Sequence, residues 1–391
     1  MKPLRLFISF AFVLLAGMLI FFFLARHAKV KRMQLISEPV GIETSTKPAL
    51  TVTVPEAAVV SAGNIDTHMH LGGKLSSGEM KSLYARAAEY LIENMDAIGL
   101  EKAVLVTVIS PSATMGGEAI EQLTAATIAL YPDRLFRMAG GAQLGTIIES
   151  TDPDAVTSSI QQSFRTQATA LLDAGAIGFG EMITLHPCLG SKHNYQFAPP
   201  DHPLFLLLAD IAAERGVPID LHAEAVAETR TMPENIQRVC DQNPETLEAT
   251  IPAIETLLSH NRSANIVWQH IGWDNTGEMT VELLRRLLDT HPNLFMALKV
   301  EERGFQVGTN SQVSMPNRIV DSSGRIEQDW LDLFEDFPDR FMVGADEFVD
   351  ATGEQPVGAA SLDATWKMVD QLPADLAQKF GSENAARVYG L

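Results

Sequence analysis

Histidines and carboxylates fall at the ends of short apolar runs in this sequence, in a pattern that could hold a metal. His68 and His70 lie in the run Asp66-Thr67-His68-Met69-His70, and alternate side chains of an extended strand share one face. Asp66 lies on the same face, beneath the two imidazoles. Two neutral imidazoles at neighbouring positions on one face suit a divalent metal of the zinc type. For these two residues alone, a pair of surface or core histidines is the alternative.

Four further residues end later apolar runs and complete the pattern. They are Glu181, His222, His270 and Asp346. Taken singly, a histidine in an apolar strand is most often a core residue, and a glutamate at the start of a loop is most often exposed. A buried Asp346, however, is costly without a partner, which a metal or a metal-bound water supplies. Chance placement would scatter such residues over helices and both ends of the strands, so together they predict one site.

Short β-rich apolar runs alternate with longer amphipathic stretches from Gly63 onward, and these elements must position the candidate residues. The predicted strands are Asn64–Leu71, Lys102–Ile109, Leu135–Ala142, Ala176–Met182, Pro218–Glu224, Asn265–Ile271, Asn293–Val300 and Arg340–Phe348. The predicted helices include Glu79–Ile98, Asp154–Ala174, His202–Arg215, Glu245–His260 and Thr280–His291. Several of these helices end at a glycine or proline, namely Gly99, Gly175, Gly216 and Pro292.

Eight such strand–helix units predict an α/β fold, a closed (β/α)8 TIM-type barrel over residues 63–391. The alternative is an open doubly wound sheet, but that fold usually places a glycine-rich phosphate turn after its first strand, where this chain has histidines. In a barrel all strand ends surround a single mouth, so the candidate residues converge there. The long loops Ile183–Asp201 and Glu301–Ile326 follow strands four and seven on the same face and can shape a substrate pocket.

An N-terminal membrane anchor is predicted for residues 1–32. Phe7–Ala25 is a run of apolar or small residues with Ser9 as its only hydroxyl side chain, and as a helix it spans about 28 Å, close to the thickness of a bilayer. Basic residues flank the run on both sides, so the side of the membrane that the remaining chain faces stays open. A cleaved signal peptide is the alternative, although basic residues crowd the place of its cleavage site. Residues 33–62, with three prolines, are predicted to be a linker.

The composition excludes several classes of protein. The chain has 29 Lys+Arg against 49 Asp+Glu, a formal charge of −20, which argues against nucleic acid or an anionic lipid surface as the main partner. Its 46% of hydrophobic residues exclude a disordered chain. Cys188 and Cys240, the two cysteines, cannot form a disulfide scaffold or a four-thiolate zinc site, and one bridge between them remains open. A homo-oligomer remains open as well.

The order His-x-His, strand-four carboxylate, His, His, Asp resembles the amidohydrolase superfamily of metal-dependent hydrolases. The likeness extends from Asp66 to Glu383–Leu391, which is similar to the closing helix of the amidohydrolase-related (amidohydrolase 2) branch. This resemblance implies a buried divalent metal, with Zn²⁺ preferred. The implied ligands are His68, His70 and Asp346 for a first ion and His222 and His270 for a second ion, with Glu181 bridging the two.

The resemblance leaves the number of ions open. Many members of the superfamily carry a carboxylated lysine at the strand-four position, where this chain has Glu181, as some members do. The branch also includes decarboxylases with one ion, which is held by the His-x-His pair, the strand-five His and the strand-eight Asp. In those enzymes the strand-six His acts in catalysis. Glu181 favours two ions here.

The expected activity is hydrolysis of an ester, lactone or amide bond in a small molecule, because a divalent metal lowers the pKa of water from about 15.7 toward about 7. Asp346 would take the proton of the water and deliver it to the leaving group. His270, where it is not a ligand, would polarise the carbonyl or shuttle protons. The alternatives are a metal-dependent decarboxylase of an aromatic or unsaturated acid, and a non-catalytic barrel that binds metal or a partner.

Substrate-binding residues are expected at the same mouth. Lys299, at the end of strand seven, could bind a substrate carboxylate. The alternative for Lys299 is that it extends its ammonium group to solvent. Glu224 and Trp273 are the other candidates for substrate contacts. Further residues that follow strands four to six could line the pocket, namely His186, His193 and Asp274.

Overall fold

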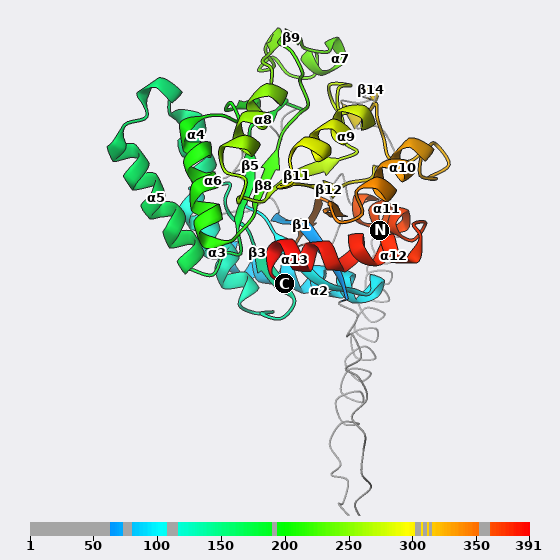
Figure 1. Cartoon of the computed structure of the whole chain (residues 1–391). Helices are drawn as coiled ribbons and strands as arrows, with labels where there is room; N and C mark the ends of the chain where they lie inside the picture. Colours follow the sequence, from blue (N-terminus) through cyan, green and yellow to red (C-terminus); the bar gives the residue numbers. More distant parts are fainter. Residues whose placement is uncertain are drawn as a thin grey trace, which may run out of the picture. The chain divides into compact units, whose positions relative to one another are not determined.

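A wall of parallel strands carries the candidate residues in the computed structural model (Figure 1). The structure describes residues 63–72, 80–107, 116–189, 194–301, 306–307, 311–312, 315–351 and 360–391. The predicted anchor, residues 1–32, and the predicted linker, residues 33–62, lie outside these ranges and stay predictions. Within the described ranges, no helix combines the length and the apolar character that a membrane crossing requires.

In the described part of the chain, the wall consists of eight segments that pair in the order of the sequence. They are β1 (Asn64–Gly72), β2 (Leu100–Leu105), β3 (Leu135–Arg137) with β4 (Ala139–Gly140), β5 (Phe179–Ile183), β8 (Ile219–His222), β11 (Ile266–Ile271), β12 (Leu294–Leu298), and β15 (Phe341–Val343) with β16 (Glu347–Asp350).

Two sheets join to close this wall. One has the order β16-β1-β2-β3 and the other has the order β15-β12-β11-β8-β5-β4, with every pairing parallel. Only Met138 separates β3 from β4, and residues 344–346 separate β15 from β16. Because each of these pairs is one continuous segment, the sheets meet at both edges. The predicted barrel is therefore confirmed.

Helices cover the outside of the wall (Figure 1). They are α2 (Met80–Ile98), α3 (Gly117–Ile128), α4 (Leu144–Ser150), α5 (Ser158–Asp173), α6 (Pro203–Arg215), α8 (Ile251–His260), α9 (Val281–Thr290), α10 (Gln328–Asp336), α11 (Ala360–Val369) and α12 (Ala374–Gln378). The last helix, α13 (Asn384–Tyr389), packs instead against side chains inside the wall. The sequence sets the ends of α6: His202 Nδ1 accepts a hydrogen bond from Leu204 N at 3.1 Å, and Pro203 takes the first helical position. Gly216 ends the helix with a φ of 66°, which glycine adopts readily.

Two predicted helices begin later in the structure than the sequence pattern indicates. The predicted helix Glu245–His260 begins at Ile251, and the predicted helix Asp154–Ala174 begins at Ser158. In the first case, β10 (Thr246–Leu247) pairs with β9 (Arg230–Thr231) instead of joining the helix. In the second case, Thr157 Oγ1 accepts a hydrogen bond from Ile160 N at 3.3 Å and caps the helix.

Apolar side chains fill the barrel and the space between its wall and the helices. Inside the wall, Ile65, Val104 and Val267 belong to a buried cluster that also includes side chains of α13. Tyr389 of α13 donates its hydroxyl hydrogen to Asp220 Oδ1 at 2.5 Å. Helix α13 therefore closes the end of the barrel at which the strands begin, opposite the mouth.

Two excursions extend from the ends of β5 and β8. The first contains β6 (Leu185–His186) and β7 (Gln196–Phe197), and the second contains β9, α7 (Glu234–Gln237) and β10. A disulfide between Cys188 and Cys240 joins them, so the bridge that the sequence left open is formed. In the loop after β12, β13 (Gln306–Val307) pairs with β14 (Ser311–Gln312).

Candidate metal centre

Strand β1 brings two imidazoles to the mouth of the barrel, where a carboxylate from the turn after β15 meets them. His68 Nε2 and His70 Nε2 lie 3.2 Å apart. Asp346 Oδ1 lies 3.0 Å from His70 Nε2 and 3.9 Å from His68 Nε2. Both histidines are buried, and the side chain of Asp346 is only 14% exposed. We call these three residues the first donor set.

A second donor set consists of Glu181, His222 and His270, from β5, β8 and β11. Glu181 Oε1 lies 2.5 Å from His222 Nδ1 and 2.7 Å from His270 Nε2. Glu181 Oε2 faces the first donor set, at 3.7 Å from His68 Nε2 and 4.0 Å from His70 Nε2. Glu181 therefore presents one oxygen to each pair of histidines. The structure brings all the predicted ligands into one cluster.

The geometry of the first donor set fits a divalent cation. Ligand atoms about 2.0–2.2 Å from a tetrahedral metal lie about 3.3 Å from one another. His70 Nε2 lies 3.2 Å from His68 Nε2 and 3.0 Å from Asp346 Oδ1, close to this spacing, and the third distance, from His68 Nε2 to Asp346 Oδ1, is longer at 3.9 Å. Two imidazole nitrogens at 3.2 Å repel when both present a lone pair, and a cation between them removes this repulsion. Imidazole and carboxylate donors together are typical of zinc and of other divalent ions.

Electrostatic interactions keep both carboxylates of the cluster negatively charged. Burial alone would raise the pKa of Glu181, but His222 and His68 outweigh it and hold that pKa well below its usual range. Burial opposes ionisation of Asp346 in the same way, and Lys299 and nearby histidines hold its pKa well below the usual range. Burial also opposes protonation of His68, yet the two carboxylates raise its pKa to about 9. The cluster therefore favours positive charge at its centre, which a divalent cation supplies.

The backbone is strained at two of the candidate ligands. His270 and Asp346 have φ angles of 62° and 57°, in the left-handed region that favours glycine. Such a conformation costs about 1–3 kcal/mol per residue and is typical of functional sites. His270 lies near the end of β11, and Asp346 lies between β15 and β16. Backbone hydrogen bonds hold both positions: Asp346 N donates to His68 O at 2.9 Å, and Trp273 N donates to His270 O at 2.8 Å.

Lys299, directly after β12, lies at the edge of the first donor set. Its Nζ is 2.6 Å from Asp346 Oδ2 and 3.7 Å from Glu301 Oε1. The same Nζ lies 3.9 Å from the centre of the Trp273 ring, which is a cation–π contact. The side chain of Lys299 is 7% exposed, so it does not extend into bulk solvent. The structure thus places Lys299 and Trp273, both predicted to contact substrate, side by side at the mouth.

Glu224 and Asp274 belong to neither donor set. Glu224 is buried and accepts hydrogen bonds from Asn275 N at 3.3 Å and from Asn275 Nδ2 at 2.5 Å, and burial raises its pKa to about 7. Asp274 accepts hydrogen bonds from several backbone amides of the same loop. Both carboxylates therefore stabilise the loop after β11.

Aromatic rings pack against one histidine of each donor set. The ring of His186 has its centre 4.8 Å from that of His222. Phe348 of β16 stacks on His70, with ring centres 4.2 Å apart and planes 15° apart. His193, the other histidine predicted to line the pocket, lies outside the described residues.

Sequence reasoning did not single out Asp220, which lies beneath the second donor set. It precedes His222 by two residues, and alternation along β8 puts both side chains on one face. The same signal had identified Asp66 beneath His68. Asp220 is fully buried, and burial raises its pKa to about 7, while the hydroxyl of Tyr389 donates to it. The alternation of side chains along β8 would therefore have been sufficient to identify Asp220 from the sequence.

Gly141 allows the third wall segment to approach Glu181 closely. A Cβ atom on Gly141 would lie 2.2 Å from Thr107 O and 2.5 Å from Glu181 O. Both atoms belong to the backbone, Glu181 in β5 and Thr107 just after β2, so neither can move aside alone. Glu181 can occupy its observed position only because residue 141 has no side chain.

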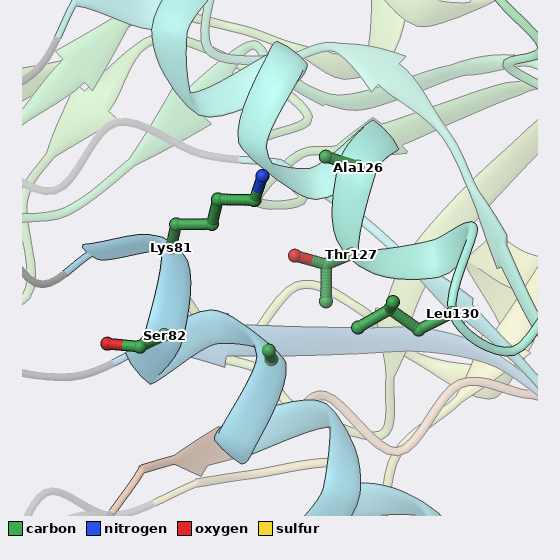
Figure 2. Close-up of a pocket in the computed structure, with 6 residues that line it drawn as sticks. Lys81, Ser82, Ala126, Thr127 and Leu130 are labelled. Carbon is green, nitrogen blue, oxygen red and sulfur yellow. The ribbon is translucent and has the colours of Figure 1, made fainter.

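A surface pocket of about 470 Å³ lies between α2 and α3 (Figure 2). Its lining consists of Lys81, Ser82, Ala85, Ala126, Thr127 and Leu130. Neither donor set contributes to this lining, so the pocket has no part in the chemistry of the cluster.

The family of the chain follows from comparison with known proteins. Residues 65–391 match the family model described as Amidohydrolase, of the amidohydrolase 2 type, and the chain therefore belongs to this family. The resemblance predicted from the six residues is confirmed. The family and the His/Glu/Asp cluster together support a divalent metal centre. No curated protein matches the chain.

Solved structures are similar to this chain at low sequence identity. An uncharacterised TIM-barrel protein from Bordetella bronchiseptica is 15% identical, with a TM-score of 0.47, and the match covers 84% of this chain and 98% of the other. A 5-carboxyvanillate decarboxylase from Novosphingobium aromaticivorans, solved with manganese, is 14% identical, with a TM-score of 0.45 and coverage of 84% and 96%. A 4-oxalomesaconate hydratase from Rhodopseudomonas palustris is 14% identical, with a TM-score of 0.45 and coverage of 84% and 95%. At this level of similarity, they define neither the substrate nor the metal of this chain.

Replacing Gly141 by alanine should disturb the cluster, because the new methyl group must displace the backbone of Glu181. We expect the free energy of unfolding to fall by about 1–3 kcal/mol, as overpacking typically causes, and binding of Co²⁺ to weaken. The control is Gly145→Ala in α4, where the nearest atom to the new Cβ is Gly140 O at 3.9 Å. There alanine should stabilise the helix by about 0.5–1 kcal/mol. Denaturant and Co²⁺ titrations measure both effects, and a Gly141→Ala chain of unchanged stability would contradict the packing argument.

Proposed function

We propose that this chain is a metal-dependent hydrolase that cleaves an ester, lactone or amide bond of a small molecule at the mouth of the barrel. The observation that carries the proposal is the position of Glu181, whose two oxygens face the two pairs of histidines. Two ions would suit this arrangement: His68, His70 and Asp346 would hold one, His222 and His270 would hold the other, and Glu181 would serve both. Zn²⁺ is preferred, since imidazole and carboxylate ligands are those that zinc takes in hydrolases.

The proposed reaction assigns a proton-transfer role to Asp346. A bound divalent cation supplies Lewis acidity, which lowers the pKa of water and polarises a substrate carbonyl. The low pKa of Asp346 keeps its carboxylate ionised at neutral pH. Water adds to the carbonyl carbon while Asp346 takes one of its protons, and Asp346 returns that proton to the leaving oxygen or nitrogen as the bond breaks. His270, whose pKa burial lowers to about 4, stays a neutral imidazole that can accept a hydrogen bond or bind metal.

Lys299 and Trp273 form the substrate-facing edge of the site in this proposal. Asp346, at 2.6 Å, and the Trp273 ring, at 3.9 Å from its centre, orient the Lys299 ammonium group. An ammonium group at this edge favours a substrate that carries a carboxylate. Glu224 contributes indirectly, because its hydrogen bonds to Asn275 stabilise the loop that carries Trp273.

A metal-dependent decarboxylase of an aromatic or unsaturated acid is the second candidate, and one observation favours it. The first donor set offers three ligand atoms for a single ion without help from His270. A neutral His270 would then be available for proton transfer when the bond to the carboxylate carbon breaks and the electron pair left on the substrate carbon takes up a proton.

A substrate panel tests the proposal. The full-length chain, loaded with Zn²⁺ or Mn²⁺, is assayed for acid release from esters, lactones and amides and for CO₂ release from substituted benzoates. We expect hydrolysis, and we expect Asp346→Asn to lower kcat by about 10²–10⁴-fold, because it removes the proton acceptor. The control is Asp370→Asn, at an exposed position directly after α11, and it should leave kcat unchanged.

Two other results would redirect the assignment. Release of CO₂ without hydrolysis across the panel would favour the decarboxylase. An Asp346→Asn chain with an unchanged kcat would contradict a catalytic role for Asp346. A native chain that binds metal but turns over no member of the panel would favour a barrel that only binds metal.

The number of bound ions should depend on Glu181. We expect Glu181→Gln to reduce bound Zn²⁺ from two ions per chain to one, because the amide cannot bridge two cations as a carboxylate does. Elemental analysis of the dialysed protein gives the ratio of metal to chain. Glu282→Gln, at an exposed position in α9, is the matched control. One ion in the native chain, with no change in Glu181→Gln, would show that Glu181 is no bridge.

Localisation is a further part of the proposal. Residues 1–32 anchor the chain, and the Cys188–Cys240 disulfide favours a barrel on the oxidising side of the membrane, because disulfides persist in oxidising compartments. We expect the full-length chain to stay in the membrane pellet after an alkaline wash and to be cut by protease added outside intact cells. A chain without residues 1–32 should appear in the soluble fraction. A native chain in the soluble fraction would contradict the anchor, and protection from protease would contradict the orientation.

A further inference from the structure

The two excursions at the mouth form a small unit with its own packing. We call residues 184–189, 194–201 and 223–250 the cap. Buried apolar side chains from both excursions contact one another in a cluster apart from the main core, namely Leu185, Leu189, Val226, Met232, Ile236 and Leu247. The cap therefore has its own apolar cluster, against which Trp273 of the loop after β11 also packs.

Covalent and hydrogen bonds lock the two excursions together at Cys188. The disulfide joins Cys188 to Cys240. Asn243 Oδ1 accepts a hydrogen bond from Cys188 N at 2.7 Å, and Asn243 Nδ2 donates to Cys188 O and to Ile236 O, both at 2.9 Å. The segment that contains Cys240 and Asn243 thus holds Cys188 at three points: its amide, its carbonyl and its sulfur.

His186 precedes this lock by two residues and contacts the metal centre. Its ring centre is 4.8 Å from that of His222, and the ring planes are 37° apart. His222 in turn directs Nδ1 to Glu181 Oε1 at 2.5 Å. The terminal torsion of a histidine side chain has a broad, roughly twofold preference, so rotation of the His222 ring could turn Nδ1 away from Glu181. A ring packed against His222 opposes that rotation.

The first donor set shows the same arrangement with a different support. Phe348 stacks on His70 at 4.2 Å, and it belongs to β16, a part of the barrel wall. The ring against His222 instead comes from the cap. The orientation of one ligand therefore depends on the wall, and the orientation of the other depends on an element outside it.

We propose that His186 is a positioning residue for His222, and that the Cys188–Cys240 disulfide and Asn243 hold it there. The cap thereby sets the metal affinity of the second donor set. This inference rests on the proposed metal centre. Among the described residues, His186 belongs to neither of the two groups of side chains whose ligand atoms lie close enough to share an ion. His222 lies outside both groups as well and contacts Glu181 through Nδ1, so the effect of His186 passes through His222 to Glu181.

Metal titration of ring variants tests this role. In the full-length chain, His186→Ala should raise the Co²⁺ dissociation constant of the second donor set by about 10–100-fold, as loss of a ligand's support typically does. The d–d absorption of that Co²⁺ should change, because the His222 ring is no longer fixed. His186→Phe keeps a flat ring and should retain the native constant and spectrum. His260→Ala, at an exposed histidine of α8, is the control.

Other outcomes of this titration decide against the proposal. Native affinity and spectrum in His186→Ala would overturn it. Loss of one Co²⁺ per chain in both His186→Ala and His186→Phe would show that His186 is a ligand. If the alanine variant does not fold, His186→Leu, which is closer in volume, takes its place in the same comparison.

A double-mutant cycle tests the link to the disulfide. Replacing Cys188 and Cys240 together by serine should weaken Co²⁺ binding about as much as His186→Ala does, and should have no further effect in the His186→Ala chain. Additive effects would overturn the link. Cysteine variants are preferable to thiol reductants, which bind Co²⁺. If the serine pair does not fold, Asn243→Ala loosens the same lock with the disulfide retained.

The failure of this inference can be told apart from the failure of the proposed function. If the native chain binds no Co²⁺, the metal centre itself is wrong. If the native chain binds Co²⁺ and loses it in His68→Ala, but His186→Ala binds it as the native chain does, then only the role of His186 is wrong.

Discussion

The carboxylate of Glu181, buried between imidazoles from three strands, is the interaction on which the site depends. Removing a charged carboxylate from water costs several kcal/mol unless positive charge or hydrogen-bond donors surround it. Here His222 and His270 approach one oxygen at 2.5 and 2.7 Å, and the β1 histidines face the other. These residues are adjacent only when the wall is closed and when Gly141 leaves room beside Glu181. The charge distribution at the mouth therefore depends on closure of the barrel.

Much of this arrangement could be predicted because it rests on local periodicity. Alternation along a strand places His68 and His70 on one face, and the same rule, applied to β8, would have found Asp220. The contacts that the sequence did not reveal join distant segments. Glu224 turns to Asn275, 51 residues later, and the helix predicted from Glu245 begins at Ile251 because the preceding residues pair with a strand. The positive φ of His270 also depends on its surroundings and not on local propensity.

The charge of the molecule and the charge of its site act in opposite directions. The chain carries a net charge of −20, which attracts cations and repels anions at long range. At the mouth, Lys299 provides an ammonium group beside Asp346, and bound cations would add further positive charge. An anionic substrate would therefore be repelled by most of the surface and attracted only near the cluster. The charge of the protein thus favours binding of an anionic substrate only when that substrate is within a few ångströms of the cluster.

The pairing of β1 with β16 also determines the order in which the chain can fold. Met69 pairs with Glu347, so the first and last segments of the wall meet only after the whole barrel sequence has left the ribosome. Until then, nascent chains carry β1 with one unpaired edge, which is prone to association with other chains. Contacts of such long sequence separation also slow folding. Cys188 and Cys240 are both synthesised well before β16, so the cross-link can form in a half-built barrel and limit the conformations that the open intermediate samples.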